Sequence, residues 1–400
     1  MLSGECIICF APDPWADIWR NRHRLLSVFS RTNRVLYVEP RLHVRPLARR
    51  LRSGEIRPRD FFRRRIEEVQ KNLFVYHDPL FLPRTGWRGI GKAMDRLRQA
   101  LLERAVRRLG FARPVLWLVR PSCWDVLGKF DEKAVLYQIV DDYLSYPGVT
   151  PRARERLERE ERVIAGHADL VVVTAETLLA AKRGLHPNVI LIPNGVDEGT
   201  LEEGRRAGGD VPRELVEARK PVLGYLGGIT EKLDLELLEK VARSLEAAST
   251  GTLVLVGPVN VASVGALRRI ERLRASPAVL FTGKKEAMDV PAFLRGFDVG
   301  LIPYAPGEQS RSIDPLKLYE YLAFGIPVVA ADIPSMRPHA AVVRVAADHA
   351  TFLAHLGEAA LERDEALAAR RRAIAAENGW ERRADQISDA LEAALRTRSR

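Results

Sequence analysis

The chain has 400 residues, of which 46% are hydrophobic, and its 63 Lys and Arg against 52 Asp and Glu give a formal net charge of +11. This length favours two domains of about 200 residues, because one hydrophobic core seldom serves so long a chain. Three cysteines exclude a disulfide framework, and no apolar run approaches the roughly 20 residues that span a bilayer. The first residues lack the basic start of a secretory signal, so we expect a cytoplasmic protein, either free or peripheral on the cytoplasmic face of the inner membrane.

The first half of the chain alternates short apolar runs with longer helical patterns. The apolar runs cover residues 6–10, 35–38, 73–76, 115–119, 135–140, 170–174 and 189–193. Runs that are apolar throughout are typical of strands buried on both faces of a parallel sheet. With helical patterns such as 90–109 and 152–165 between them, residues 1–200 are predicted to form a doubly wound α/β domain. Cys6 and Cys9 fall in the first strand, and no Cys or His cluster completes a metal site there, so none is predicted.

The second half repeats this pattern after a change in composition. Residues 198–220 are charged and hold four glycines, which predicts an interdomain linker, placed at 201–220. Apolar runs return at residues 222–226, 253–256, 279–282, 299–302, 328–330 and 342–345. We therefore expect a second domain of the same kind over residues 221–379. The Ala-, Arg- and Glu-rich residues 363–400, broken at Asn378 and Gly379, predict C-terminal helices.

Residues 312–330 combine a helix start, charged residues and a buried strand. Asp314 is predicted to cap the helix and Pro315 to open it, because Pro lacks the amide that would need a partner. Gly325 and Pro327 then end the helix before the strand at 328–330.

The same helix is predicted to bind a ligand. A helix N-terminus favours a phosphate, and Lys317 adds a full positive charge one turn into the helix. Glu320 lies on about the same face and offers two acceptor oxygens that suit sugar hydroxyls. An ordinary surface ion pair between Lys317 and Glu320 is the alternative.

The loops after other strands of the second half are the next candidates, since ligands of open α/β sheets bind beyond the carboxyl ends of the strands. Gly227 and Gly228 let backbone amides approach a diphosphate, and Lys232 adds charge there; a plain tight turn is the alternative. Tyr304 follows the strand at 299–302. The small and polar residues 305–312, which include Ser312, are typical of a mobile loop that closes over a sugar or phosphate.

Candidate residues also follow two strands of the first half. Asp141, Asp142 and Tyr143 follow the strand at 135–140, and two adjacent acids at the end of a buried strand favour a functional role over the alternative of capping the next helix. Trp15, in the loop after the first strand, is expected to stack on a sugar ring with His23 nearby, and a pair that packs together or faces solvent is the alternative.

Residues 315–329 resemble the donor-site segment of GT-B glycosyltransferases of the "group 1" kind. Five further motifs stand in that family's order: Asn194-Gly195-Val196-Asp197, Gly224-Tyr225-Leu226-Gly227-Gly228, Val256-Gly257-Pro258, Phe281-Thr282-Gly283 and Ile302-Pro303-Tyr304. The resemblance implies two Rossmann-like domains facing each other across a cleft, the first for the acceptor and the second for the nucleotide sugar. It also implies that the helices from about residue 380 pack back on the first domain.

The resemblance also assigns roles to residues. It implies that Lys317, Leu318 and Glu320 contact a nucleotide sugar and that Gly283 lies at the nucleotide base. This chain has Ser312 where the common pattern has a first Glu, a variation similar to that of polysaccharide glucuronosyltransferases. In those enzymes an Asp at the place of Asp141 acts as the base.

Together these features predict an enzyme, a metal-independent glycosyltransferase without a cofactor, because the sequence holds no Asp-x-Asp metal motif. It would move a sugar from a nucleotide diphosphate, a UDP-sugar, to a hydroxyl of a glycan or lipid-linked glycan. Asp141 is the predicted base, with Asp142 positioning it or capping a helix, and Tyr143, Trp15 and His23 are predicted on the acceptor side. Attack opposite the leaving group would invert the product, and front-side retention is the alternative. A sugar-nucleotide epimerase or hydrolase of the same fold, and a non-catalytic lipid or nucleic-acid binder, are the rival functions.

The positive charge is concentrated near the N-terminus. Residues 1–112 hold 24 Lys and Arg and only 11 Asp and Glu, and residues 41–65 alone contain ten arginines against Glu55 and Asp60, with Phe61 and Phe62 among them. Arginines interleaved with aromatic residues favour an anionic membrane surface or a phosphate-bearing lipid acceptor as the partner. A solvated arginine-rich loop is the plain alternative, and nucleic acid is the least favoured partner.

Overall fold

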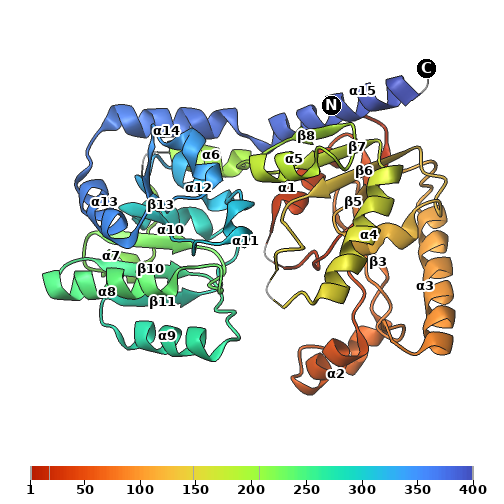
Figure 1. Ribbon diagram of the computed structural model, residues 1–400, viewed down its shortest axis with the longest axis horizontal. Coiled ribbons are helices and arrows are strands. Elements are labelled where there is room, and N and C mark those ends of the chain that lie inside the picture. The colour runs from red at the N-terminus through yellow and green to blue at the C-terminus, as the bar shows by residue number, and fades with distance from the viewer. Residues whose placement is uncertain (1, 18, 147, 207, 399–400) are drawn as a thin grey trace.

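The computed structural model describes the chain except residues 1, 18, 147, 207 and 399–400, and its two α/β domains lie side by side (Figure 1). The N-terminal domain holds an eight-stranded sheet in the order β3-β4-β2-β1-β5-β6-β7-β8. Its strands are β1 (Cys6–Phe10), β2 (Arg34–Val38), β3 (Ile66–Gln70), β4 (Leu73–Tyr76), β5 (Val115–Leu118), β6 (Ala134–Ile139), β7 (Leu170–Val173) and β8 (Val189–Leu191).

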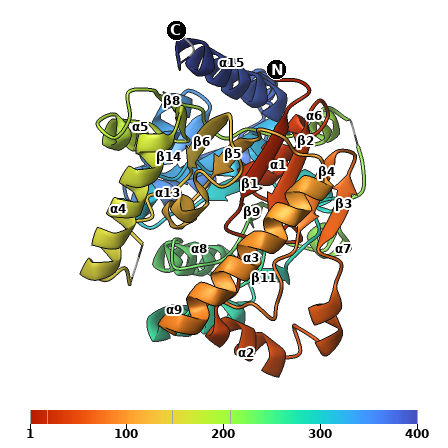
Figure 2. The same cartoon turned by 90° about the vertical axis from the view of Figure 1, so that its right-hand side faces the viewer.

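The C-terminal domain holds a six-stranded, entirely parallel sheet in the order β11-β10-β9-β12-β13-β14. Its strands are β9 (Val222–Leu226), β10 (Thr252–Val256), β11 (Val279–Gly283), β12 (Val299–Ile302), β13 (Val328–Ala331) and β14 (Val343–Ala346). Two sheets of this kind, each covered by helices, confirm the predicted fold class of two Rossmann-like domains (Figures 1 and 2).

The helices connect the strands and cover the sheets. In the first half they are α1 (Asn21–Phe29), α2 (Val44–Arg52), α3 (Arg88–Arg108), α4 (Pro151–His167), α5 (Glu176–Lys182), α6 (Glu198–Arg205) and α7 (Arg213–Val216), with 3₁₀ turns η1 (Pro58–Phe62) and η2 (Pro121–Val126). In the second half they are α8 (Leu235–Ala248), α9 (Val264–Ala275), α10 (Val290–Gly296), α11 (Glu308–Arg311), α12 (Leu316–Ala323), α13 (His349–Leu361), α14 (Glu365–Glu377) and α15 (Trp380–Arg398), with the 3₁₀ turn η3 (Pro334–His339). Over the described residues, no helix is both long and apolar enough to cross a bilayer.

Burial on both faces explains why the strands read as continuous apolar runs. In β1, Ile7 and Cys9 pack into the core on one face of the sheet, while Ile8 and Phe10 pack into the core on the other. Helices therefore have to cover both faces, which is the doubly wound arrangement.

The patterns of the sequence did not indicate β3. It runs antiparallel to β4 at the edge of the sheet, and a turn in which Asn72 has a φ of 64° joins the two strands. Glu67 and Glu68 in β3 are exposed, because an edge strand needs no second apolar face. A short charged strand of this kind lacks the apolar run by which its neighbours are recognised.

Residues 201–220, predicted as a linker, belong instead to the C-terminal domain. Leu201 of α6 and Leu215 of α7 are buried in the core of that domain. Gly204 lies against the backbone of α12, where a Cβ atom would come within 2.2 Å of the Ala323 carbonyl oxygen. The glycines that suggested a flexible segment thus include one that allows close packing. Residue 207 of this segment lies outside the described residues.

The C-terminal helices connect the two domains. α14 lies over the C-terminal domain, whereas α15 runs on over the N-terminal domain beside α1 (Figure 1). Trp380, Ala384, Ile387 and Leu391 of α15 are buried in the core of the N-terminal domain. The break between the helices at Asn378 and Gly379 carries a backbone bridge from Val196 to Gly379. Residues 399–400 of the predicted helical segment lie outside the described residues.

Asp314 lies at the junction of the two domains, and its predicted role as a helix cap is wrong. α12 begins at Leu316 with Pro315 at its N-cap and no side-chain cap. The Asp314 carboxylate instead accepts hydrogen bonds from the backbone N–H of Asn194 (2.6 Å) and from the Tyr319 hydroxyl. Asn194 also donates from its side chain to the Asp314 carbonyl (2.6 Å), so the Asn194 motif ties the end of the first domain to the residues that lead into α12.

The buried Asp314 makes stability depend on pH. Burial raises its pKa to about 6, against the hydrogen bond from Asn194 and the nearby Arg383, which lower it. The folded protein therefore favours the neutral acid. We expect this contribution, about 2–3 kcal/mol at most, to be complete below about pH 4 and lost as the pH rises through about 6. Chemical denaturation of the wild type and of Asp314→Asn over this range measures it; a constant difference between their free energies of unfolding would contradict the assignment.

Candidate functional site

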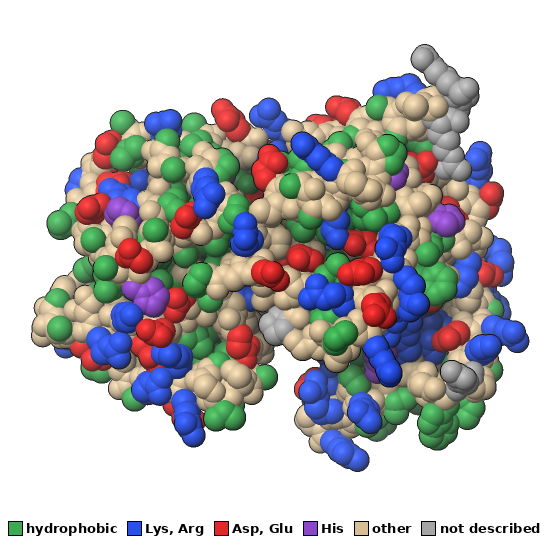
Figure 3. Space-filling model, viewed as in Figure 1, with side chains coloured by type: hydrophobic (Ala, Val, Ile, Leu, Met, Phe, Trp, Pro, Cys, Tyr) green, Lys and Arg blue, Asp and Glu red, His purple; other side chains and the backbone are tan. Residues whose placement is uncertain are grey.

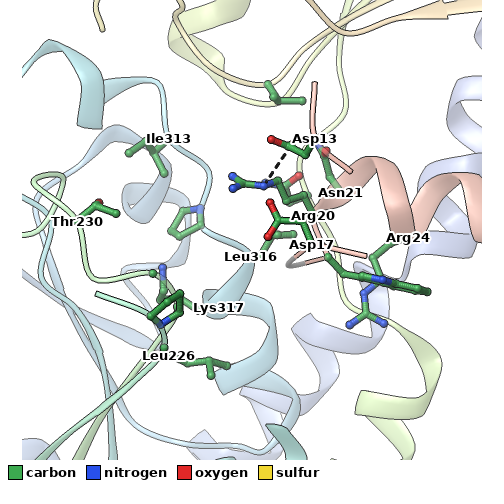
Figure 4. Close-up of a pocket in the computed structure, with 18 of the residues that line it drawn as sticks. Asp13, Asp17, Arg20, Asn21, Arg24, Leu226, Thr230, Ile313, Leu316 and Lys317 are labelled. Carbon is green, nitrogen blue, oxygen red and sulfur yellow. Dashed lines mark ion pairs between the residues drawn. The ribbon is translucent and has the colours of Figure 1, made fainter. Parts of the chain in front are cut away.

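A cleft of about 860 Å³ lies between the two domains and is lined by residues of both. The carboxyl ends of β6 and β9 lead into it, through Asp141 on one side and Gly227 on the other. Figure 4 shows Asp13, Arg20 and Arg24 of the N-terminal domain facing Leu226, Thr230 and Lys317 of the C-terminal domain. This is the position at which open parallel sheets bind ligands.

Lys317 is the central cation on the C-terminal side of the cleft. Its side chain lies in the first turn of α12 and is only 8% exposed. Its ammonium donates a hydrogen bond to the Tyr304 hydroxyl (2.8 Å) and lies 5.0 Å from the centre of the Tyr225 ring. Burial disfavours the charge, but the nearby Tyr225 and Tyr304 oxygens outweigh it and raise the pKa of Lys317, so the side chain is positive at neutral pH.

The glycines beside Lys317 make room for its side chain and for a neighbouring loop. Gly227 has a φ of 131°, and a Cβ atom there would lie 3.4 Å from Cε of Lys317. Gly257, in the Val256-Gly257-Pro258 motif, lies close to the backbone of Gly227. A Cβ atom added at position 257 would lie 2.0 Å from the Gly227 carbonyl oxygen. Gly227 and Gly228 both line the cleft, so this loop brings backbone beside a buried positive charge.

Glu320 also lines the cleft, partly buried, and no ion pair joins it to Lys317 among the described residues. The alternative of an ordinary surface ion pair between Lys317 and Glu320 is therefore wrong. Burial raises the pKa of Glu320, while Arg24, from α1 of the other domain, lowers it. Arg24 in turn forms an ion pair with Asp197 of the Asn194-Gly195-Val196-Asp197 motif (3.2 Å).

Three predicted donor contacts do not line the cleft. Leu318 is fully buried in the core of the C-terminal domain, because it lies on the opposite face of α12 from the cleft. Ser312 is buried and its hydroxyl donates to the Gln309 carbonyl (3.3 Å). Gly283 is exposed at the end of β11, while the following Lys284 and Lys285 do line the cleft.

Asp141 and Lys232 meet across the cleft. Oδ2 of Asp141 accepts hydrogen bonds from the Lys232 ammonium (3.1 Å) and from the Tyr146 hydroxyl (2.5 Å). The Lys232 ammonium also lies 5.3 Å from the centre of the Tyr146 ring. The other oxygen, Oδ1, is buried without a hydrogen-bond partner among the described residues. Asp141, the predicted base, and Lys232, predicted to bind phosphate, thus form one ion pair between the domains.

The residues after Asp141 differ in their positions. Asp142 does not line the cleft; its carboxylate accepts from the backbone N–H of Leu144 (3.2 Å), which stabilises a turn. The next helix, α4, is capped by Thr150, so the alternative that the acid pair caps it is wrong. Tyr143 lines the cleft and its hydroxyl donates to the Val119 carbonyl (3.0 Å).

Trp15 and His23 form part of an aromatic cluster beside the cleft. Trp15 lines the cleft and its ring lies 5.2 Å from both Trp19 and His23. His23 itself is fully buried and does not line the cleft; its Nε2 lies 3.1 Å from the Tyr37 hydroxyl. Burial, together with the nearby Arg22, lowers the pKa of His23 to about 4, so the ring is neutral and supports Trp15 from behind.

Several lining residues were not singled out from the sequence. Asp13 forms ion pairs with Arg20 (3.4 Å) and with Arg22, and these residues frame the N-terminal side of the cleft (Figure 4). Tyr146 also lines it. The sequence did hold a signal for these residues. Arginines at positions 20, 22 and 24 stand around the start of a helix, where positive charge is unfavourable without an acidic partner such as Asp13. Within the described part of the chain, no group of three or more His, Cys, Asp or Glu side chains is arranged to hold a metal ion.

Comparisons with known proteins agree with this arrangement. Residues 220–361 match the family model described as "Glycosyl transferases group 1". A putative teichuronic acid biosynthesis glycosyltransferase, TuaH of Bacillus subtilis (strain 168), is 27% identical over 235 residues, which is 56% of this chain and 56% of that protein. The match therefore spans little more than half the length of this curated relative.

Solved structures resemble the whole chain. A sucrose-phosphate synthase of Thermosynechococcus elongatus superposes with a TM-score of 0.71 at 16% identity, covering 98% of this chain and all of that one. HepE of Anabaena, in complex with UDP, gives a TM-score of 0.65 at 14% identity, again covering 98% and 100%. At these identities the likeness concerns the fold, which is the GT-B arrangement predicted from the motifs. The chain therefore has the GT-B fold, and its residues 220–361 match the group 1 glycosyl transferases.

Proposed function

We propose that this protein is a glycosyltransferase that moves a sugar from a UDP-sugar to a hydroxyl of a glycan or lipid-linked glycan. The observation that carries the proposal is the buried, positively charged Lys317 beside the Gly227-Gly228 backbone, with Glu320 on the same side of the cleft. The relative from Bacillus subtilis, described as acting in teichuronic acid biosynthesis, supports a glycan product. HepE complexes with UDP, and with UDP and glucose, support a UDP-sugar as the donor.

In this proposal the C-terminal domain stabilises the leaving diphosphate. Lys317 supplies a fixed positive charge in a site of low dielectric constant, and the loop at Gly227 and Gly228 allows the phosphates close to the backbone. Glu320 accepts hydrogen bonds from hydroxyls of the sugar. Lys317 and Lys232 offset the diphosphate charge, so the proposed reaction uses neither a metal ion nor a cofactor.

The N-terminal domain activates the acceptor. Asp141 is the proposed general base and Trp15 offers an aromatic face for an acceptor sugar. Before donor binds, Lys232 occupies Oδ2 of Asp141. A diphosphate attracts Lys232 more strongly than one carboxylate does, so donor binding would draw the lysine away and leave Asp141 for the acceptor hydroxyl. The Tyr146 hydrogen bond keeps the carboxylate oriented during this exchange.

A screen of nucleotide sugars followed by product analysis tests the function. Each bound ligand stabilises the folded protein according to its affinity, so a UDP-sugar is expected to raise the melting temperature most, ahead of GDP- and ADP-sugars. UDP release is then expected only when a glycan acceptor is present, with inverted configuration at the transferred sugar. Equal UDP release without acceptor would identify a hydrolase, and an epimerised donor would identify an epimerase. Failure of every nucleotide sugar to stabilise the protein would overturn the proposal.

A further inference from the structure

Residues 43–65, here called the basic arm, contribute little to the core of the N-terminal domain. The arm comprises α2 and η1 and projects at the lower end of the N-terminal domain in Figure 1. Leu47 is the one buried residue of α2, and η1 has none. A nine-residue helix is marginal in water without a packing partner, so an element of this kind gains from a surface that lies outside the domain.

The root of the arm is held firmly, so its position is defined. Arg41 forms an ion pair with Asp95 of α3 and donates to the Pro83 carbonyl (3.0 Å). The backbone N–H of Val44 bonds to the Arg84 carbonyl (3.2 Å), and that of Arg84 bonds to the Leu42 carbonyl (2.7 Å). These bonds place Pro83 and Arg84, and the residues next to them, beside the start of the arm.

Large apolar side chains are exposed on the arm and on these adjoining residues. The exposed set comprises Phe62 (89%), Trp87 (71%), Ile90, Val44, Phe81 and Leu51. Phe61, Phe62 and Phe81 line a hollow together with Arg63 and Arg65, and the Arg65 guanidinium lies 5.5 Å from the centre of the Phe81 ring. Single exposed apolar residues are ordinary, but three phenylalanines that line one hollow, with further exposed apolar residues on the arm and on the segment bonded to it, mark an interaction surface.

The positive charge of the arm is mostly uncompensated. Among the nine arginines of the arm, Arg50 and Arg63 have acidic partners in Glu55 and Glu67. Among the described residues, no ion pair is found for the arginines at positions 45, 49, 52, 57, 59, 64 and 65. Figure 3 shows Lys and Arg side chains interspersed with hydrophobic ones over this end of the molecule.

We propose that the basic arm docks the protein on an anionic lipid bilayer. Arginines bind anionic headgroups at the membrane surface, while Phe62, Leu51 and Trp87 insert at the boundary between headgroups and acyl chains. The aliphatic members of the set favour a bilayer over a nucleic acid, since Val44, Leu51 and Ile90 gain nothing from a phosphate backbone or from stacking on bases. This surface uses none of the cleft residues and is independent of the proposed function.

Co-sedimentation of the full chain with lipid vesicles tests this surface. The wild type is expected to bind vesicles of phosphatidylcholine mixed with phosphatidylglycerol, and to bind pure phosphatidylcholine vesicles at least about tenfold more weakly. Raising the salt to about 0.5 M is expected to release most of the bound protein, because it screens the headgroup charge. Equal binding to both vesicle types, or no binding to either, would overturn the proposal.

Variants on and off the arm separate docking from general charge and folding effects. Arg49→Glu combined with Arg52→Glu is expected to weaken binding to the anionic vesicles by more than about tenfold. The same charge change on the C-terminal domain, Arg243→Glu with Arg370→Glu at exposed positions of α8 and α14, is expected to leave most of the binding. Phe62→Ser is expected to weaken binding several-fold, whereas Met288→Ser, which removes a side chain that is 84% exposed elsewhere, is expected to have no effect.

Two further measurements complete the test. The arm variants are expected to keep the wild-type melting temperature and the wild-type turnover of a water-soluble acceptor without vesicles, so a failure of docking is distinguishable from a failure of the proposed activity. Duplex DNA is expected to bind more weakly than anionic vesicles. DNA binding as tight as vesicle binding, and unchanged in Phe62→Ser, would assign the arm to nucleic acid and overturn the proposal.

Discussion

Replacement of Lys317 by methionine is expected to weaken binding of the nucleotide sugar by about 30- to 1,000-fold. The ammonium is buried, bonds to the Tyr304 hydroxyl and lies beside Gly227, so water screens its attraction to a diphosphate less than that of an exposed cation. Methionine keeps about the length of the side chain without its charge, and it also removes the cost of burying an ammonium. Isothermal titration calorimetry with the UDP-sugar found in the screen measures the loss.

The matched control for Lys317 is Lys284, which also lines the cleft but is exposed. Lys284→Met is expected to change the dissociation constant by no more than a few-fold, because water already screens its charge. Both variants should unfold at temperatures close to that of the wild type. Donor affinity that survives in Lys317→Met would remove the cleft beside α12 as the donor site.

Replacement of Asp141 by asparagine is expected to lower the rate of transfer by about 10²- to 10⁴-fold while sparing donor binding, since a general base contributes on this order. The ion pair with Lys232 leads to an expectation about donor affinity as well. Without the carboxylate, Lys232 is free to meet the diphosphate, so donor affinity should stay unchanged or increase. Single-turnover transfer and calorimetry on the same variant measure the two effects separately.

Asp142→Asn is the control for Asp141, because its side chain stabilises a local turn and does not line the cleft. It is expected to keep the rate of transfer within a few-fold of the wild type. An equal loss of rate in both variants would point to a structural role of the acid pair. Transfer at the wild-type rate in Asp141→Asn would show that a group other than Asp141 accepts the proton of the acceptor hydroxyl. A product of retained configuration from the wild type would lead to the same conclusion.

Much of the fold was predictable because its signals are local in the sequence. Strands such as β1 and β7 are buried on both faces, so every one of their residues is apolar and the runs stand out from the helical patterns around them. The donor helix could likewise be located, from Pro315, Lys317 and Gly325, because helix starts, charges and glycine stops lie within a few residues of one another.

Features that depend on surroundings were not predictable in the same way. A capping residue is recognised by its type, yet the Asp314 carboxylate bonds to Asn194, 120 residues away, instead of to its own helix. The glycine at position 204 suggested a linker, whereas the approach of α12 gives it a packing role. His23 has the chemistry of a cleft residue but lies fully buried behind Trp15, and burial of a side chain follows from what packs over it.

The sequence alone determined the two parallel-sheet domains, the helix α12 with Lys317 and Glu320, and the charge of the basic arm, since all of these follow from residue types at short spacing. Only the tertiary structure decided which distant side chains meet. Asp141 and Lys232 are 91 residues apart and lie on different domains, and their 3.1 Å contact depends on how the two sheets face each other. No periodicity or spacing encodes that distance, because it depends on how α15 packs on the N-terminal domain and how Asn194 bonds to Asp314.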